Sequence, residues 1–410
     1  MPRTKEPTLG TWHVSFGRRR ALAFTSLGHF VNDGSVFFVP VIVDLLTTLN
    51  GATFFEGAVV LSVFYLTSTL ASLGVGRWAD RAGIPGPLIA LGMALLGVGL
   101  SGFYFVAAFT SGAELFALAV LSSLVMGFGS SFYHPLGGSI LQAAFGRGTT
   151  GKALGTNGAF GSVGRAIYPT IYFVVVAPVL TKPGSLAFFG MVGMGAALLI
   201  WIGLGGADPE AGRIDAPQAS AKSSLTKPMI VLLVVSFVRS AALFGVTQYV
   251  PTFLTNQRGL GLSPLEGLSL TAFFASAIVG QPLFGLLADR IDHRLVLTIS
   301  TCGAAASIFG FVNAGGAVSI ALLSLFGFFA YTGFPVLMSL AADYSSQSGS
   351  AFGNSLVWGL GATGGNALGP LLIYAISLND YARLGYSFEV MAVLALASGV
   401  GAMLIPKPAR

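Results

Sequence analysis

The sequence is short of cysteine, of histidine and of the patterns that bind nucleotides. Of its 410 residues, only Cys302 is a cysteine, and the four histidines are scattered without metal-ligand spacing. A disulfide within the chain and a thiolate metal cluster are therefore excluded. The chain also lacks a Gly-x-x-x-x-Gly-Lys-Ser/Thr phosphate loop and a paired serine and base. We therefore expect no enzyme, no metal or other cofactor, and no ATP as driving force.

Charged residues are also scarce, at 9% of the sequence against about 25% in soluble domains, while 54% of the residues are hydrophobic. Such a chain cannot cover itself with polar surface, so most of it must face lipid. Its 56 glycines are typical of closely packed membrane helices. The formal net charge of +6 does not indicate a nucleic-acid-binding protein, because the basic residues gather in alternate loops between apolar runs.

The apolar runs predict an all-α membrane protein with twelve transmembrane helices. The predicted spans are 21–48, 55–76, 86–108, 113–144, 152–180, 185–204, 228–256, 264–287, 294–314, 316–343, 350–378 and 384–404. A polar, Ala/Pro/Ser-rich linker at 205–227 separates an N-terminal six-helix half, 1–204, from a C-terminal six-helix half, 228–410. The first run is long and has no small-x-small cleavage site, so we expect a retained helix rather than a signal peptide.

Lysines and arginines predict which loops lie on which side of the membrane. An even number of spans puts both termini on one side, and that side collects sixteen of the 21 basic residues. The other side has three: Lys182, Arg258 and Arg383. By the positive-inside rule we expect a multi-pass protein of the plasma (inner) membrane, with both termini and the linker in the cytoplasm. The two remaining basic residues, Arg165 and Arg239, fall inside predicted spans.

The second and eighth predicted spans end in the same polar motif. Its two copies, 209 residues apart, are Gly76, Asp80 and Arg81, and then Gly285, Asp289 and Arg290. A glycine followed by an Asp–Arg pair forms a tight polar turn just outside a bilayer. Its repetition therefore indicates a duplicated membrane bundle whose halves are related by pseudo-two-fold symmetry. We predict that these six residues act as a cytoplasmic gate by bonding neighbouring helix ends.

Prolines also recur at corresponding places in the two halves. Pro135 in span 4 corresponds to Pro335 in span 10, and Pro169 in span 5 corresponds to Pro370 in span 11. Paired prolines of this kind predict where helices bend, and bending is what alternating access between two halves requires.

With repeated Gly-x-x-x-Asp-Arg turns, twelve spans and a central linker, the chain resembles the major facilitator superfamily over essentially its whole length. Within it, His29-Phe-Val-Asn32-Asp33 and Phe132-Tyr-His134-Pro135 resemble the fosmidomycin-resistance-type exporters, and Gly365-Asn-Ala-Leu-Gly369-Pro370 fits the same group. The resemblance implies proton-driven efflux and a central cavity lined by spans 1 and 7. Span 5 departs from the group, because Tyr168-Pro169 replaces Gly-Pro and Arg165 replaces a small or neutral residue.

Ionisable residues deep in the spans are the candidates for chemistry, because a charge inside a bilayer is costly. Asp33 lies about 18 Å into the first span at 1.5 Å per residue, and His29 is one turn earlier on the same face. A carboxylate beside an imidazole can hold and pass a proton, so we predict proton coupling through Asp33 and His29. The alternative is a polar pair that fixes helix packing. His134 can relay protons too, or merely satisfy carbonyls that Pro135 frees.

Two arginines at similar depth predict an anionic substrate. Arg239 in span 7 corresponds by symmetry to the region of Asp33, and Arg165 lies near the middle of span 5. A buried guanidinium requires an anionic substrate or a carboxylate partner. We therefore predict either an Asp33–Arg239 ion pair or competition between Asp33 and a substrate anion for Arg239. Static structural roles are the alternative for both arginines.

Further polar and aromatic residues are candidate substrate contacts in the cavity wall. They are Asn32, Tyr133, Gln248, Tyr249, Gln281, Tyr331, Asn354, Trp358 and Asn366. Each can instead be a hydrogen-bonding contact between helices. Asp44 lies near the outer end of span 1, where access to water makes a role as an ion gate less compelling.

Together these features predict a proton-coupled secondary transporter that carries a small organic anion, such as a carboxylate or phosphonate, by alternating access. One alternative is a proton-driven multidrug or antibiotic efflux pump. Another is a membrane sensor or passive facilitator without coupled transport. Symport and antiport, and import and export, all fit the sequence. The expected partners are the solute, protons and the lipid bilayer, with no nucleic acid, and the expected assembly is a monomer.

Overall fold

The computed structural model describes residues 17–145, 149–205, 226–288, 290–344 and 356–407. Within these ranges the chain is helical apart from short turns. Ten of the helical segments are long and apolar enough to cross a membrane. Large apolar side chains such as Val179, Trp201 and Leu404 are exposed on the outside of the bundles, as a surface that faces lipid requires.

The N-terminal half contains six consecutive spans, three of which are built from more than one helix. In chain order its elements are α1 (Arg18–Val36), α2 (Val39–Asn50), α3 (Phe54–Ala82), α4 (Pro85–Phe109), α5 (Gly112–Ser130), α6 (Tyr133–Phe145), α7 (Thr150–Thr170), the π-helix η1 (Ile171–Val176), α8 (Ala177–Leu180) and α9 (Lys182–Leu204).

The C-terminal half follows the same plan. Its elements are α10 (Lys227–Asn256), α11 (Pro264–Ala288), α12 (His293–Asn313), α13 (Gly316–Ala330), α14 (Gly333–Tyr344), the π-helix η3 (Leu356–Thr363), α16 (Gly364–Ser377), η4 (Tyr381–Arg383), α17 (Leu384–Gly401) and η5 (Ala402–Leu404). The pairs α13–α14 and η3–α16 lie at the predicted places of spans 10 and 11.

Spans 1, 4 and 10 are broken into two helices, and each second helix has a proline in its first turn. Pro40 lies at the start of α2, Pro135 at the start of α6 and Pro335 at the start of α14. Proline lacks a backbone N–H and is best tolerated in the first turn of a helix, so it favours a restart of the helix at these three places. The other predicted pair, Pro169 and Pro370, lies inside α7 and α16 instead. The bends that the paired Pro135 and Pro335 predict are therefore confirmed.

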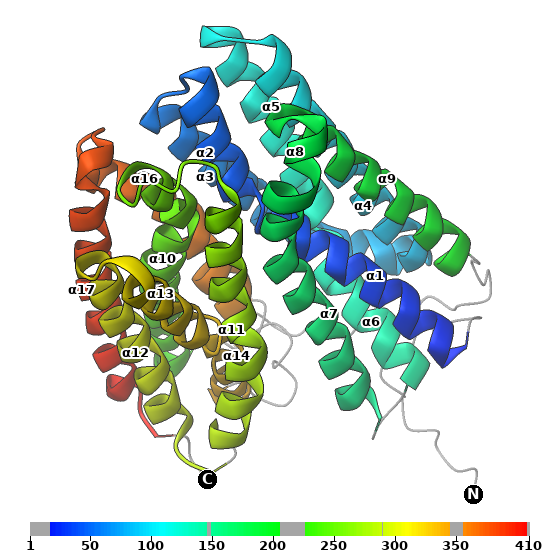
Figure 1. The fold of residues 1–410 in the computed structure, drawn as a ribbon. Coiled ribbons are helices and arrows are strands. Elements are labelled where there is room, and N and C mark those ends of the chain that lie inside the picture. Colours follow the sequence, from blue (N-terminus) through cyan, green and yellow to red (C-terminus); the bar gives the residue numbers. More distant parts are fainter. Residues whose placement is uncertain (1–16, 146–148, 206–225, 289, 345–355, 408–410) are drawn as a thin grey trace, which may run out of the picture.

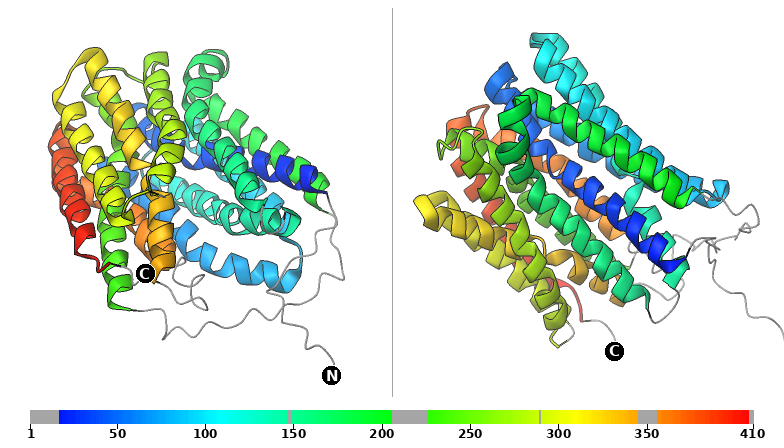
Figure 2. Two further views of the ribbon diagram at one scale, coloured as in Figure 1. Left: turned by 90° about the horizontal axis from the view of Figure 1, so that it is seen from below. Right: turned by 45° about the vertical axis from the view of Figure 1, so that its right-hand side comes forward.

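The two halves form two bundles that lie side by side, as Figure 1 shows in blue to green and in yellow-green to red. The start of α1 and the end of α17 lie at the same end of the molecule, called here the terminal end; the opposite end is called the far end (Figures 1 and 2). Between the halves, α7 packs against α11 and α3 packs against α16.

Hydrogen bonds between the halves lie towards the far end. The Thr170 and Thr271 hydroxyl oxygens are 2.6 Å apart, and the Thr271 hydroxyl donates to the Ala166 carbonyl at 2.6 Å. Gly267 on α11 lies directly against Pro169 on α7. Towards the terminal end the ribbons of α7 and α11 diverge (Figure 1). The described halves are thus joined at the far end.

Candidate functional site

Glycines bring α1 and α7 close together in the middle of the N-terminal half. A Cβ on Gly161 would lie 2.4 Å from the His29 ring, and one on Gly164 would lie 2.1 Å from the Phe30 carbonyl oxygen. A larger residue at either position would push the helices apart. The close approach places the polar face of α1, with Asp33, opposite the side chain of Arg165 on α7.

Asp33 is the centre of a cluster of charged and ionisable side chains. Its Oδ2 lies 3.5 Å from His29 Nε2 and 4.0 Å from Arg165 Nη2, and its Oδ1 lies 3.5 Å from His134 Nε2. The Asn32 amide donates to Asp33 Oδ1 at 3.2 Å. The Asp33 side chain is only 8% exposed, whereas that of His134 is 50% exposed. His134 therefore connects the buried carboxylate to the surroundings, as a proton relay would need to.

Asn157 on α7 completes this cluster, and the sequence analysis missed it. Its Oδ1 lies 2.9 Å from His29 Nδ1 and accepts a hydrogen bond from the Tyr133 hydroxyl at 2.9 Å. Its amide nitrogen donates to the Thr25 hydroxyl at 3.3 Å. The available signal was its place in a glycine-rich span two turns before Arg165. The neutral amides chosen from the sequence, such as Asn32 and Asn366, all lie in other spans.

Arg165 connects Asp33 to the C-terminal half. Its Nη2 donates to the Ser162 hydroxyl at 3.1 Å, and its guanidinium carbon lies 4.6 Å from the centre of the Phe37 ring and 4.8 Å from that of Tyr331. Cation–π contacts of this kind stabilise a guanidinium between two aromatic faces. The buried Nε has no hydrogen-bond partner. Arg165 therefore has an unused donor where the two halves meet.

Arg239 does not pair with Asp33, so the predicted Asp33–Arg239 ion pair is wrong for this structure. Its Nε donates to the Thr301 hydroxyl at 2.9 Å, and its Nη2 donates to the Ala330 carbonyl at 2.9 Å. A Cβ on Gly333 would lie 2.3 Å from the same Nη2. The side chain thus occupies a slot inside the C-terminal half, between α10, α12 and the α13–α14 break.

Three members of the cluster have the residue types of a metal site. The ligand atoms of His29, Asp33 and His134 all lie within 4.8 Å of one another. Two of the four histidines, which showed no metal-ligand spacing in the sequence, thus meet at one carboxylate. The Arg165 guanidinium lies at the same carboxylate, however, and a fixed positive charge opposes the binding of a metal cation. The arrangement fits protons better than a metal ion.

The remaining predicted wall residues divide by location. Tyr133 and Asn32 belong to the Asp33 cluster, and Tyr331 belongs to the Arg165 contacts. Several others are buried and keep polar atoms without a hydrogen-bond partner: both amide atoms of Gln248, the Tyr249 hydroxyl and Asn366 Oδ1. The Gln281 amide donates to the Tyr331 carbonyl at 3.5 Å. Asn354 and the side chain of Trp358 lie outside the described residues.

The structure describes only part of the predicted gate. Gly76 and Gly285 have open space where a Cβ would lie, and Arg290 is exposed beyond the end of α11. Asp289 and the side chains of Asp80 and Arg81 lie outside the described residues. The gate function of this motif stays a prediction.

The chain is similar to known membrane transporters along most of its length. The family model described as Major Facilitator Superfamily matches residues 25–353 and 257–410. The fosmidomycin resistance protein of Escherichia coli (strain K12) is 26% identical over 397 residues, which cover 93% of this chain and 91% of that protein. The probable sulfoacetate transporter SauU of Cupriavidus necator is 26% identical over 356 residues, which cover 80% of each chain.

The fold is also that of solved transporter structures. The crystal structure of the nucleoside transporter NupG superposes with a TM-score of 0.79 at 13% sequence identity, over 95% of this chain and 100% of that one. At this level of identity the likeness concerns the fold alone.

Proposed function

Because the chain belongs to the major facilitator superfamily, a family of membrane transporters and not of enzymes, we propose that it is a proton-coupled secondary transporter of a small organic anion. Carboxylates and phosphonates are the proposed solutes, moved by alternating access between the two halves. One observation carries the proposal: the buried carboxylate of Asp33 lies among His29, His134 and Arg165, and Arg165 also touches the opposite half.

The proton site is the pair of Asp33 and His29. Asn157 Oδ1 is an acceptor, so it holds the hydrogen of neutral His29 on Nδ1. His29 Nε2 then faces Asp33 Oδ2 with a lone pair, and two acceptors 3.5 Å apart repel unless a proton lies between them. The pair therefore favours holding one proton. His134, half exposed beside the same carboxylate, supplies a route for that proton to enter and leave.

The anion site is Arg165, whose Nε is free and whose Nη2 is shared with Asp33 and Ser162. When the pair of Asp33 and His29 holds no proton, the Asp33 carboxylate competes with a solute anion for the guanidinium. When the pair holds its proton, the charge of the carboxylate is offset and Arg165 is released for the anion, so proton and anion favour each other's binding. This coupling supports symport. One relative is named as a probable sulfoacetate transporter, and sulfoacetate is an anion, so this name supports the same solute class.

The proposed orientation places the terminal end in the cytoplasm of a plasma (inner) membrane. The excess of basic residues in the loops on that side supports it. With this orientation, a structure that is closed at the far end is open towards the cytoplasm. Protons then reach the Asp33 cluster from the cytoplasm through His134. Export of an antibiotic-like anion is the second candidate, and the similarity to the fosmidomycin resistance protein supports it.

The test uses purified protein in liposomes that enclose a pH-sensitive dye. Adding the transported carboxylate or phosphonate outside should acidify the lumen, because symport carries a proton with each anion. Arg165→Gln should raise the anion concentration needed for half-maximal acidification at least about tenfold. This is the effect of losing about 1.4 kcal/mol from a charge-assisted bond. Arg239→Gln is the matched control, because it removes an equally buried arginine that lies inside one half.

The outcomes separate the alternatives. Alkalinisation of the lumen would show antiport and favour the exporter. A response to cationic dyes but not to anions would contradict the anion site. If Arg165→Gln and Arg239→Gln lose the anion response equally, both arginines have structural roles and Arg165 is not the anion site. No solute-dependent proton movement with any anion, in protein that still moves solute, would indicate a passive facilitator.

A further inference from the structure

Two buried carboxylates join the halves at the far end, well away from Asp33. Asp44 lies on α2 of the N-terminal half, and Glu266 lies on α11 of the C-terminal half; both are 0% exposed. Between them, Thr255 Oγ1 on α10 lies 2.7 Å from Asp44 Oδ2 and 3.3 Å from Glu266 Oε2. The expectation that water reaches Asp44 is therefore wrong for this structure, because the closure of the two halves covers it.

If Asp44 and Glu266 are both ionised, the hydrogen bonds that join them through Thr255 are short of one hydrogen. The Thr255 hydroxyl has a single hydrogen, yet it lies within hydrogen-bond distance of two carboxyl oxygens. If it donates over the shorter distance to Asp44, its oxygen can only accept from Glu266, and that requires a proton on Glu266 Oε2. Two buried carboxylates this close also favour sharing one proton, because their charges repel in a medium of low dielectric constant.

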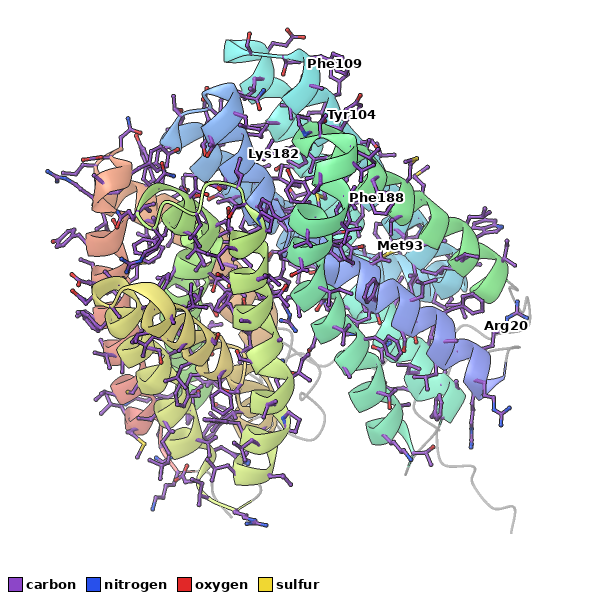
Figure 3. All side chains as sticks on the ribbon, in the orientation of Figure 1. Arg20, Met93, Tyr104, Phe109, Lys182 and Phe188 are labelled. Carbon is purple, nitrogen blue, oxygen red and sulfur yellow. The ribbon has the colours of Figure 1, made fainter. Side chains whose placement is uncertain are left out.

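The surroundings supply no fixed cation in place of that proton. Among the described residues, no lysine, arginine or histidine nitrogen lies within 4.0 Å of either carboxylate. The titratable groups that act on the pair from neighbouring elements are Lys182 of α9, Tyr172 of η1 and Tyr381 of η4. Lys182 is the one positive charge of these three groups, and Figure 3 shows it at the far end of the molecule.

Unused polar atoms in the same place point to a missing ligand. Asp44 Oδ1 and Glu266 Oε1 are buried without a hydrogen-bond partner. The hydroxyl of Thr252, a residue only 1% exposed, lies close enough to act on Asp44 as a donor, but it cannot serve Glu266 as well. A bound proton removes a charge and supplies one more donor to these carboxyl oxygens.

We propose that Asp44 and Glu266 form a second proton-binding site, which holds the far end closed while it is protonated. The inference rests on the proposed alternating access and adds a site to it. Opening the far end separates Asp44, on one half, from Thr255 and Glu266, on the other. Water then reaches both carboxyl groups, and the shared proton leaves. The state that holds the additional proton is favoured as the pH falls, so acid closes the far end and alkali opens it.

Aromatic side chains around the pair fit a dry, closed junction. The rings of Phe54 on α3 and Tyr381 are stacked with centroids 4.5 Å apart, and Phe54 also meets the ring of Tyr249 at 5.1 Å. These ring contacts join the N-terminal half to the C-terminal half, so they must break when the far end opens.

The test measures the distance across the far end by double electron–electron resonance between two spin labels. With Cys302→Ser as background, labels go on Ser111→Cys and Gly315→Cys, two exposed loop positions, one in each half. The full chain is studied in lipid nanodiscs from about pH 5 to about pH 9. If one proton is linked to opening, the open-to-closed ratio of the otherwise native chain should rise about tenfold per pH unit over the range in which the proton leaves.

Variants isolate the pair from other titrating groups. Glu266→Gln keeps the shape of a protonated acid, so its far end should stay closed at every pH and lose the pH response. Thr255→Val removes the bridging hydroxyl, so its far end should open at a lower pH than that of the native chain. Glu114→Gln removes an exposed carboxylate in the first turn of α5 and should behave like the parent. Asp33→Asn should keep the pH response of the far end.

The results decide between this inference and the function on which it rests. If Glu266→Gln follows the parent across the pH range, or if the parent distance does not change with pH, the second proton site is refuted. If sodium at fixed pH closes the far end, the pair binds a metal cation and the inference is also wrong. If transport proves uncoupled but Glu266→Gln still abolishes the pH response, the proposed function fails while the second site stands.

Discussion

Asn157 offers the sharpest test of how the proton is held near Asp33. The residue is buried, and its Oδ1 is the acceptor for His29 Nδ1. Asn157→Leu keeps a similar volume but removes that acceptor. The Tyr133 hydroxyl keeps a second acceptor, the Thr25 carbonyl at 2.9 Å, so His29 bears the main loss.

The magnitude follows from the difference between the two protonation states of His29. A hydrogen bond from a charged donor contributes about 1.5–3 kcal/mol and one from a neutral donor about 1 kcal/mol, so the charged imidazolium loses roughly 1 kcal/mol more. Since about 1.4 kcal/mol corresponds to one pH unit, the pH midpoint of transport should move towards acid by about one unit or slightly less. The orphaned N–H should also lower the free energy of unfolding by about 1–3 kcal/mol.

The assay is the initial rate of anion uptake into liposomes as a function of pH, together with thermal unfolding in detergent. Asn313→Leu is the control, because it removes an exposed amide that donates to Glu389, far from the cluster in sequence and in the other half. If Asn157→Leu lowers the melting temperature but leaves the pH profile unchanged, Asn157 only packs helices and the proposed role of the His29 tautomer is refuted.

Two further predictions concern stability. Gly164→Ala should destabilise the protein by about 1–3 kcal/mol, because the added Cβ would lie 2.1 Å from the Phe30 carbonyl oxygen, whereas Gly158→Ala, with nothing within 4 Å, should be tolerated in the same melting experiment. At the terminal end, hydrogen bonds from Arg294 lower the pKa of Asp292 from 3.8 to about 2. That stabilisation is complete above the ordinary value and is lost only as the pH falls towards 2. Asp292→Asn should therefore lower the melting temperature slightly and equally at about pH 5.5 and about pH 8. The effect should stay below about 1 kcal/mol because the carboxylate is 34% exposed; a difference between the two pH values would contradict the assignment.

The fold followed from the sequence because lipid imposes simple rules. Long apolar runs must be helices, and the recurring Gly-x-x-x-Asp-Arg turn and the paired prolines indicated two related halves. The breaks before Pro135 and Pro335 occur where that pairing predicted a bend. Helix lengths and bends depend on local chemistry, which the sequence displays directly.

The candidate site was only partly predictable, because it depends on the rotation and distance of packed helices. Depth alone made Arg239 seem the natural partner of Asp33, but side-chain direction decides the pairing, and α10 turns Arg239 into its own half. Arg165 reaches Asp33 because glycines on α7 let α1 approach. The buried state of Asp44 could not be read from depth either, since it depends on contact with Thr255 of α10, which in turn bonds to Glu266 of α11.

The most direct measurement follows radiolabelled anion uptake and lumenal pH together in liposomes, with the native protein and with Asp33→Asn. The native protein should acidify the lumen in proportion to anion uptake, because each anion enters with a proton. Asp33→Asn should still exchange anion for anion across the membrane but move no protons. If Asp33→Asn acidifies the lumen as the native protein does, Asp33 is not the coupling residue and the proposed mechanism is contradicted.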